Sequence, residues 1–287
     1  MHGSMCAHAG VLYVGRHAKS AQITAYDLDG RLLRRIAEYR DEHAGRSSAA
    51  GLSLDADHRL WVADQAAGVL RGFTLFGVQV AEIRQEQGGA DVAGELGEPV
   101  AVLALGSDDE LVLTVASAGR RRHAVQVLEP AGGRSLSLRP DGDPEGRFED
   151  VLGLASRGSR DLLVLEGAPR RVQVFRGGNF HFQVALDEIP GHGPATALAV
   201  DGDGTLIVAM GGDSTGIYRV ADNGRRLGQV AWGGSGDGQV EEPCALAFVP
   251  GSGLQPDRLF VMDRYGDRIQ VFTLEGTCYG AFPALVS

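Results

Sequence analysis

Apolar and polar residues alternate in short stretches along the chain, and these stretches recur in a fixed order. Residues 269–276, IQVFTLEG, alternate and then end at a glycine. Alternation with a period of two is typical of a half-buried β-strand, and a closing glycine favours a tight turn. The same pattern appears at residues 23–30, 70–77, 125–132, 172–179 and 217–224, where Asn179 replaces the glycine once. The chain therefore contains six copies of one strand-and-turn unit.

A second apolar strand precedes each copy, and its leading leucine recurs at intervals of 44 to 53 residues. An inner strand of small and aliphatic residues precedes that one, and a fourth strand follows each turn. One such sheet cannot bury both of its faces alone, but a closed ring of them can. The repeats predict an all-β fold, a six-bladed β-propeller of four-stranded antiparallel blades. We expect a single domain over residues 1–287, with blades at about 4–39, 50–84, 99–138, 150–187, 195–232 and 243–284.

The first and last copies must lie side by side when the ring closes. Each already has four strands of its own, so we expect closure by apolar packing and no exchanged strand. Cys6 and Cys244 fall on the inner strands of these two copies. We predict two buried thiols here, with a disulfide across the closure as the alternative.

Residues 243–276 carry a resemblance to a known family. They read, in order, a proline, an inner strand, a turn, a strand ending in Asp263, a polar loop, RIQVF and a glycine. A glycine-rich approach begins at Trp232. In this order the chain resembles the NHL-repeat family, most closely in the sixth copy. The resemblance implies a propeller with a binding face, and it brings no shared chemistry.

Composition narrows the classes of partner. The formal net charge is −10, and Lys19 is the only lysine. Proteins that bind nucleic acid through its backbone are more often basic, so we expect no nucleic-acid partner. No apolar run reaches the roughly 18 residues of a membrane helix, so we expect no membrane insertion. Three cysteines without CxxC spacing predict neither a zinc site nor a redox pair and fit a cytoplasmic protein. Whether residues 1–4 are native, and whether a leader was removed, stays open.

In NHL-type propellers the loops between second and third strands share one face with the loops between blades. We call this the loop face and expect ligands there, because loops on a rigid scaffold carry function. The second strands end at Arg16, Asp64, Val115, Glu166, Met210 and Asp263. If these side chains point to the axis, they form an asymmetric acidic mouth. The alternative for the carboxylates, above all Asp64 and Asp263, is that they cap their own loops by accepting backbone N–H groups.

Other loop residues offer further chemistry. The arginine cluster before His123 could bind a carboxylate, a phosphate or an RNA backbone, or it is a solvated loop. Tyr265 could present an exposed ring to a partner. Histidines 17, 43, 123 and 192 lie in loops of this face and raise a zinc site as an alternative, without HxH or HExxH spacing. The predicted ligand-binding residues are Arg16, His17, Asp64, Arg121, Arg122, His123, Glu166, Arg170, Met210, Asp213, Asp263, Arg264 and Tyr265.

The function expected from these features is a non-catalytic scaffold that holds a protein or peptide on the loop face, with a small molecule as another kind of ligand. We predict no catalytic residue and no cofactor. The first alternative is a hydrolase or lyase that uses the acidic mouth, with or without a divalent metal ion. The second is RNA binding through Arg120, Arg121 and Arg122.

Overall fold

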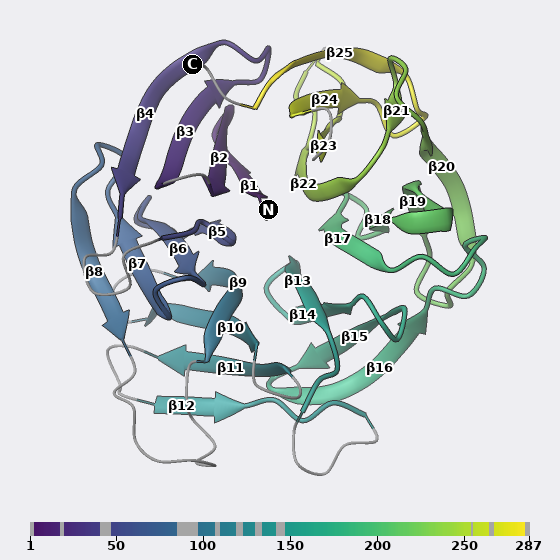
Figure 1. Ribbon diagram of the computed structural model, residues 1–287. Coiled ribbons are helices and arrows are strands. Elements are labelled where there is room, and N and C mark those ends of the chain that lie inside the picture. Colours follow the sequence, from purple (N-terminus) through teal and green to yellow (C-terminus); the bar gives the residue numbers. More distant parts are fainter. Residues whose placement is uncertain are drawn as a thin grey trace.

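Six β-sheets surround a central axis in the computed structural model, and each sheet is built from consecutive strands of the chain (Figure 1). The structure describes residues 3–17, 20–40, 47–84, 97–106, 110–118, 123–129, 134–141, 147–253, 255–263 and 267–284. The six-bladed propeller predicted from the repeats is confirmed. Blades are numbered one to six along the chain, and each inner strand contacts the inner strands of the two neighbouring blades.

The strands follow the predicted order from the axis outward. Blades one and two hold β1 (Gly3–His8), β2 (Val11–His17), β3 (Ala21–Asp27), β4 (Leu32–Tyr39), β5 (Gly51–Leu54), β6 (Leu60–Asp64), β7 (Val69–Phe73) and β8 (Gln79–Arg84). Blades three and four hold β9 (Glu98–Leu105), β10 (Val112–Ala118), β11 (His123–Glu129), β12 (Arg134–Ser137), β13 (Val151–Arg157), β14 (Asp161–Glu166), β15 (Arg171–Arg176) and β16 (Asn179–Ala185). Blades five and six hold β17 (Ala195–Val200), β18 (Leu206–Met210), the 3₁₀ turn η2 (Gly212–Ser214), β19 (Gly216–Val220), β20 (Arg226–Gly233), β21 (Gln239–Val240), β22 (Pro243–Val249), β23 (Arg258–Asp263), β24 (Arg268–Phe272) and β25 (Cys278–Pro283).

Blade five departs from the predicted four strands. The short strand β21 adds to the outer edge of β20 in parallel, with Trp232 opposite Gln239. Gly234 makes the tight return: its φ is +147° and its N–H donates to the carbonyl oxygen of Val240 at 2.9 Å. A two-residue parallel strand has too little alternation of apolar and polar residues to be predicted from the sequence.

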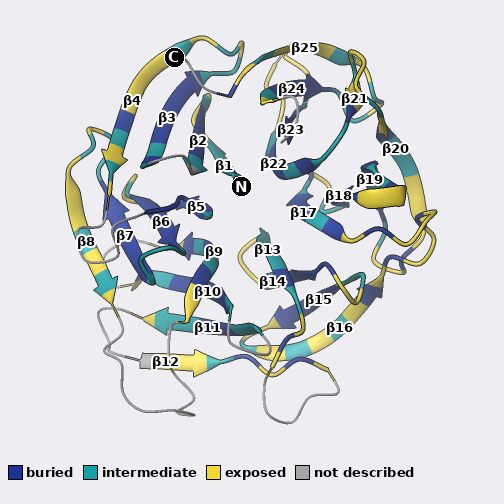
Figure 2. Cartoon of the chain, in the orientation of Figure 1, coloured by how far each residue is buried: buried dark blue, intermediate teal, exposed yellow. Residues whose placement is uncertain are grey.

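The core lies between the blades. Strands β6 and β18 are buried along their full length, whereas the outer strands β4, β8 and β16 expose much of theirs (Figure 2). Between blades four and five, Leu163, Leu165 and Val174 pack against Leu206 and Val208, and all five are fully buried. Each fully buried side chain of this size contributes about 1.5–3 kcal/mol of apolar transfer free energy.

The ring closes by packing between blades one and six, as predicted. Tyr26 is fully buried in this cluster, together with Leu12 of blade one and Phe260 of blade six. Arg258 crosses the boundary and donates to the carbonyl oxygen of Leu28 at 2.7 Å and to Asp29 Oδ1 at 2.8 Å. The two end blades remain separate sheets.

Cys6 and Cys244 form no disulfide, and each is half-buried rather than buried as predicted. Cys6 packs against the cluster between blades one and two, whereas Cys244 packs against the cluster at the ring closure. Burial raises the pKa of Cys6 to about 12. In the described residues, no helix is long and apolar enough to cross a membrane.

Candidate functional site on the loop face

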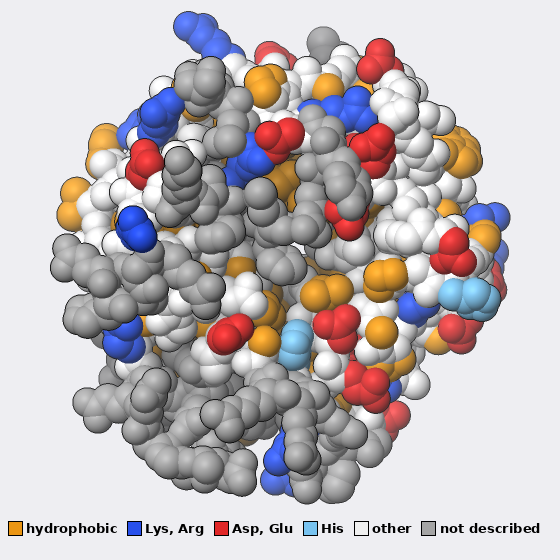
Figure 3. Space-filling view, in the orientation of Figure 1, with side chains coloured by type: hydrophobic (Ala, Val, Ile, Leu, Met, Phe, Trp, Pro, Cys, Tyr) orange, Lys and Arg blue, Asp and Glu red, His pale blue; other side chains and the backbone are white. Residues whose placement is uncertain are grey.

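The loop face is formed where the second strands end and the inner strands of the blades begin. Antiparallel pairing fixes this geometry: in blade four, for example, Glu166 at the end of β14 pairs with Val151 at the start of β13. Viewed along the axis, acidic side chains lie among apolar ones near the middle of the molecule (Figure 3). A ligand could bind the strand-end carboxylates only if their oxygens are exposed and not already hydrogen-bonded by the protein.

Glu166 is fully buried, and both of its oxygens accept hydrogen bonds. Oε1 accepts the backbone N–H of Glu149, in the loop before β13, at 2.9 Å. Oε2 accepts Arg171 Nε and Gln173 Nε2, each at 2.6 Å. The carboxylate therefore fastens the loop between blades three and four to the end of β14. The sequence left its role open between capping and ligand binding, and the structure shows capping.

Asp64 and Asp263 are also fully buried, and each holds the loop that leads into the inner strand of its own blade. Asp64 Oδ1 accepts the backbone N–H of Ser48 at 2.8 Å, and Oδ2 lies 3.3 Å from Arg71 Nε. Asp263 Oδ1 accepts the backbone N–H of Glu242 at 3.0 Å. Capping of its own loop is confirmed for Asp64, whose Oδ1 also accepts the backbone N–H of Ala67 at 3.3 Å. The described backbone bonds of Asp263 go instead to the loop between blades five and six, so own-loop capping by Asp263 stays a prediction. Contact of these carboxylates with a ligand stays a prediction that requires the loops above them to move.

In blade five, the loop that leads into the inner strand is held by residues of the 3₁₀ turn instead of a strand-end carboxylate. Met210 occupies the strand end and is fully buried, so it offers no polar group there. Asp213, in the 3₁₀ turn just beyond, accepts the backbone N–H of His192 at 2.8 Å, and Ser214 Oγ accepts that of Gly193 at 3.0 Å. The hydrogen bond from His192 N–H is the largest cause that holds the pKa of Asp213 below its ordinary value. The sequence marked Asp213 as a ligand residue and did not reveal this role.

Arg170 fixes the next stretch of loop, between blades four and five. Its guanidinium donates to the carbonyl oxygens of Leu186 at 3.1 Å and Ile189 at 2.8 Å, and also to that of Gly191. A single arginine thus binds three carbonyl groups of the loop that leads into β17. Both terminal nitrogens of Arg170 are therefore already engaged by the protein and are less available to a ligand than predicted.

His123 joins blades three and four. Its backbone exchanges two hydrogen bonds with Phe148, both at 2.8 Å, and its ring Nδ1 accepts the backbone N–H of Val151 at 2.8 Å. Nδ1 is therefore not free to bind a metal. Val115 of the same blade is fully buried and apolar, and the prediction that the second strand ends there is wrong, because β10 continues to Ala118. Within the described residues, no group of three or more His, Cys, Asp or Glu side chains could hold a metal ion.

Arg16 differs from the other strand-end residues. It forms an ion pair with Asp267 of blade six, across the ring closure. Its Nη1 is buried and has no hydrogen-bond partner among the described residues. Arg16 shares this property with Arg170, whose Nε is likewise buried and without a hydrogen-bond partner among the described residues.

Several predicted site residues lie outside the part of the chain that the structure describes. Arg121, Arg122, Arg264 and Tyr265 lie outside the described residues, as does the side chain of His17. The predicted arginine patch, the exposed tyrosine ring and the RNA alternative therefore stay predictions.

Comparisons with known proteins support the architecture. No family model and no curated protein matches the sequence. Among solved structures, the chain is similar to virginiamycin B lyase from Staphylococcus aureus, with 13% identity, a TM-score of 0.61, and coverage of 100% of this chain and 85% of that one. It is also similar to a protein of unknown function from Bacteroides caccae, with 15% identity, a TM-score of 0.62, and coverage of 95% and 93%. A streptogramin B lyase matches at 12% identity and a TM-score of 0.59, with coverage of 100% and 84%. At such low identity the likeness shows the six-bladed propeller fold alone.

Proposed function

We propose that this chain is an NHL-like, non-catalytic binding scaffold that holds a protein or peptide on its loop face. The observation that supports the proposal is the capping of the loops. In blades two, four, five and six a carboxylate accepts backbone N–H groups of the loop that leads into the inner strand. A face whose loops are held in place loses little conformational entropy when a partner binds.

The competing proposal is an enzyme such as a lyase, the activity named for two of the structural neighbours. An acid–base or metal mechanism needs carboxylates or imidazoles that can reach a substrate or an ion. Glu166 and Asp263 already accept hydrogen bonds from the protein through both oxygens, and His123 does so through Nδ1. These contacts favour the scaffold over the enzyme.

Site-directed photocrosslinking tests the proposal. A photoreactive amino acid is placed at Pro169, an exposed residue of the loop between β14 and β15, and separately at His192. The matched control is Asn223, an exposed residue in the turn between β19 and β20, at the opposite end of the blade. With extract of the source cells, we expect a defined protein adduct from the two loop-face positions and none from Asn223.

Metal analysis of the purified protein distinguishes the scaffold from a metal-dependent enzyme. About one equivalent of bound zinc or calcium, together with no adduct from Pro169 or His192, would overturn the scaffold and favour the enzyme. Equal adducts from all three positions would also count against a specific loop-face partner.

A further inference from the structure

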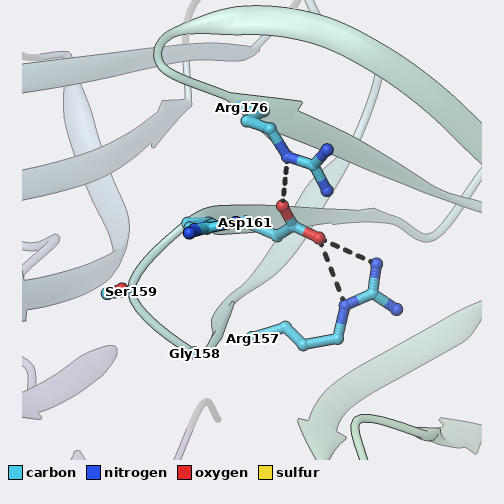
Figure 4. Close-up of a pocket in the computed structure, with 6 residues that line it drawn as sticks. Arg157, Gly158, Ser159, Asp161 and Arg176 are labelled. Atoms are coloured by element: carbon cyan, nitrogen blue, oxygen red, sulfur yellow. Dashed lines mark hydrogen bonds and ion pairs between the residues drawn. The ribbon is translucent and has the colours of Figure 1, made fainter.

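The opposite face of the ring carries an open, shallow cavity in blade four. It lies at the turn between β13 and β14 and measures about 320 Å³. Arg157, Gly158, Ser159, Arg160, Asp161 and Arg176 line it (Figure 4). None of these residues belongs to the loop face.

The turn between the first and second strands can be compared among blades two, four and five, because it has the same length in all three. It reads LDADHRL at residues 54–60, SRGSRDL at 156–162 and VDGDGTL at 200–206. Asp55 and Asp201 each cap their own turn, with Oδ1 accepting the backbone N–H groups two and four residues later. In blade four this aspartate is replaced by Arg157. The capping turn of blades two and five is therefore absent from blade four.

Two further arginines stand where blades two and five have no arginine. Arg160 occupies the position of His58 and Gly204. Arg176 pairs with Asp161 across the sheet, one position beyond Phe175, where blade five has an alanine and blade two a threonine. At three positions, blade four thus holds arginine where blades two and five hold other residues, and all three arginines line the same cavity.

Asp161 organises two of these arginines. Its Oδ1 accepts Arg176 Nε at 2.8 Å, and its Oδ2 accepts Arg157 Nη2 at 3.0 Å and Nε at 3.3 Å (Figure 4). Arg157 also pairs with Asp222 of blade five. These contacts hold the two guanidinium groups in fixed positions on either side of the carboxylate.

Donors remain for a ligand. Arg176 uses only Nε within the described residues, its side chain is 50% exposed, and its two terminal amino groups are therefore available. Arg160 is exposed, and none of its side-chain nitrogens bonds to the described part of the protein. Three arginines line the cavity, and the two carboxylates paired with them, Asp161 and Asp222, leave an excess of one positive charge there, on a chain whose net charge is −10.

We propose that this cavity is a binding site for a small oxyanion, a carboxylate or phosphate group, held by Arg160 and the terminal amino groups of Arg176. A guanidinium group binds such oxygens through two parallel N–H···O bonds. Arg176 is already held by Asp161, so it loses less side-chain entropy when the oxyanion binds. Ser159 lines the cavity and can add a hydroxyl donor. The site is independent of the loop-face function, because it lies at the other end of the blade.

Side-chain NMR of the arginine Nε–H groups tests this directly. The intact protein is titrated at pH 7 with inorganic phosphate, and in parallel with succinate, while sodium chloride keeps the ionic strength constant. We expect saturable shifts of the Arg160 and Arg176 signals. Saturation by phosphate alone identifies a phosphate site, and saturation by both probes identifies a general oxyanion site; each result supports the proposal.

Matched variants complete the test. Arg160→Gln removes no described contact, so it should fold normally and weaken binding by up to about fivefold, as expected for a partly exposed ion pair. Arg31→Gln is the control: Arg31 is an exposed arginine in the β3–β4 turn of blade one, and its described bonds, both to Asp27, use only its backbone N–H and carbonyl groups. The proposal is overturned if neither probe gives saturable shifts, or if Arg31→Gln weakens binding as much as Arg160→Gln.

Discussion

Replacement of Glu166 by alanine tests whether the strand-end carboxylates hold the loops. The substitution removes the acceptor for the backbone N–H of Glu149 and for the side chains of Arg171 and Gln173. Gln173 is fully buried and the Arg171 side chain is 20% exposed, so water replaces these bonds poorly. Loss of one partner from a buried charged pair costs about 3–5 kcal/mol of unfolding free energy.

The size of the effect can be expressed as a melting temperature. An unfolding entropy of about 2.1 cal/mol/K per residue gives about 0.6 kcal/mol/K for a chain of this length. Glu166→Ala should therefore lower the Tm by about 5–8 °C, measured by calorimetry. Hydrogen exchange should also show that the Glu149 amide loses its protection. Glu149→Ala is the control, because its exposed side chain plays no part in the cap. A Glu166→Ala shift no larger than that of the control, with the amide still protected, would refute the capping mechanism.

Three further outcomes follow from other parts of the ring. Because burial raises the pKa of Cys6 to about 12, alkylation by iodoacetamide at pH 8 should be much slower at Cys6 than at Cys278; equal rates by mass spectrometry would contradict this. Arg258→Ala removes the bonds to Leu28 and Asp29, so unfolding should become easier by about 1–3 kcal/mol, with faster hydrogen exchange in blades one and six and not in blade four. The hydrogen bond from Arg176 holds the pKa of Asp161 below its ordinary value, so its stabilisation is present above about pH 4 and is lost as the pH falls through the lowered value. Thermal melts from pH 7 to pH 3 should therefore show a gap between wild type and Asp161→Asn that narrows below pH 4, and a constant gap would argue against the pairing.

The fold could be predicted from the sequence because each blade repeats the same local signals. Alternating strands, glycine turns and evenly spaced leucines are properties of single segments, so they need no knowledge of distant contacts. The strand β21 could not be predicted in this way, because its pairing with Trp232 depends on a glycine-rich return and spans only two residues. The closure without an exchanged strand followed from counting strands in the two end blades.

The site was harder to predict because the same residue types serve two purposes. A carboxylate at a strand end could face the axis or turn into its own loop, and only the structure shows that Asp64, Glu166 and Asp263 are buried. The role of Asp213 was hidden because it lies three residues beyond the position where the repeat places an aspartate. The arginine cavity of blade four did leave a signal, the change from aspartate to Arg157, which appears only when equivalent turns are compared.

The caps act on backbone amides, and this has a consequence for variation of the loop face. Glu166 and Asp213 bind the N–H groups of Glu149 and His192, which every residue except proline possesses. The side chains at positions 149 and 192 are exposed and take no part in these bonds. Mutations there can change what the surface displays while the path of the main chain is preserved. The framework is thus separated from the displayed chemistry, so new specificities can be evolved or selected from libraries at these positions without rebuilding the ring.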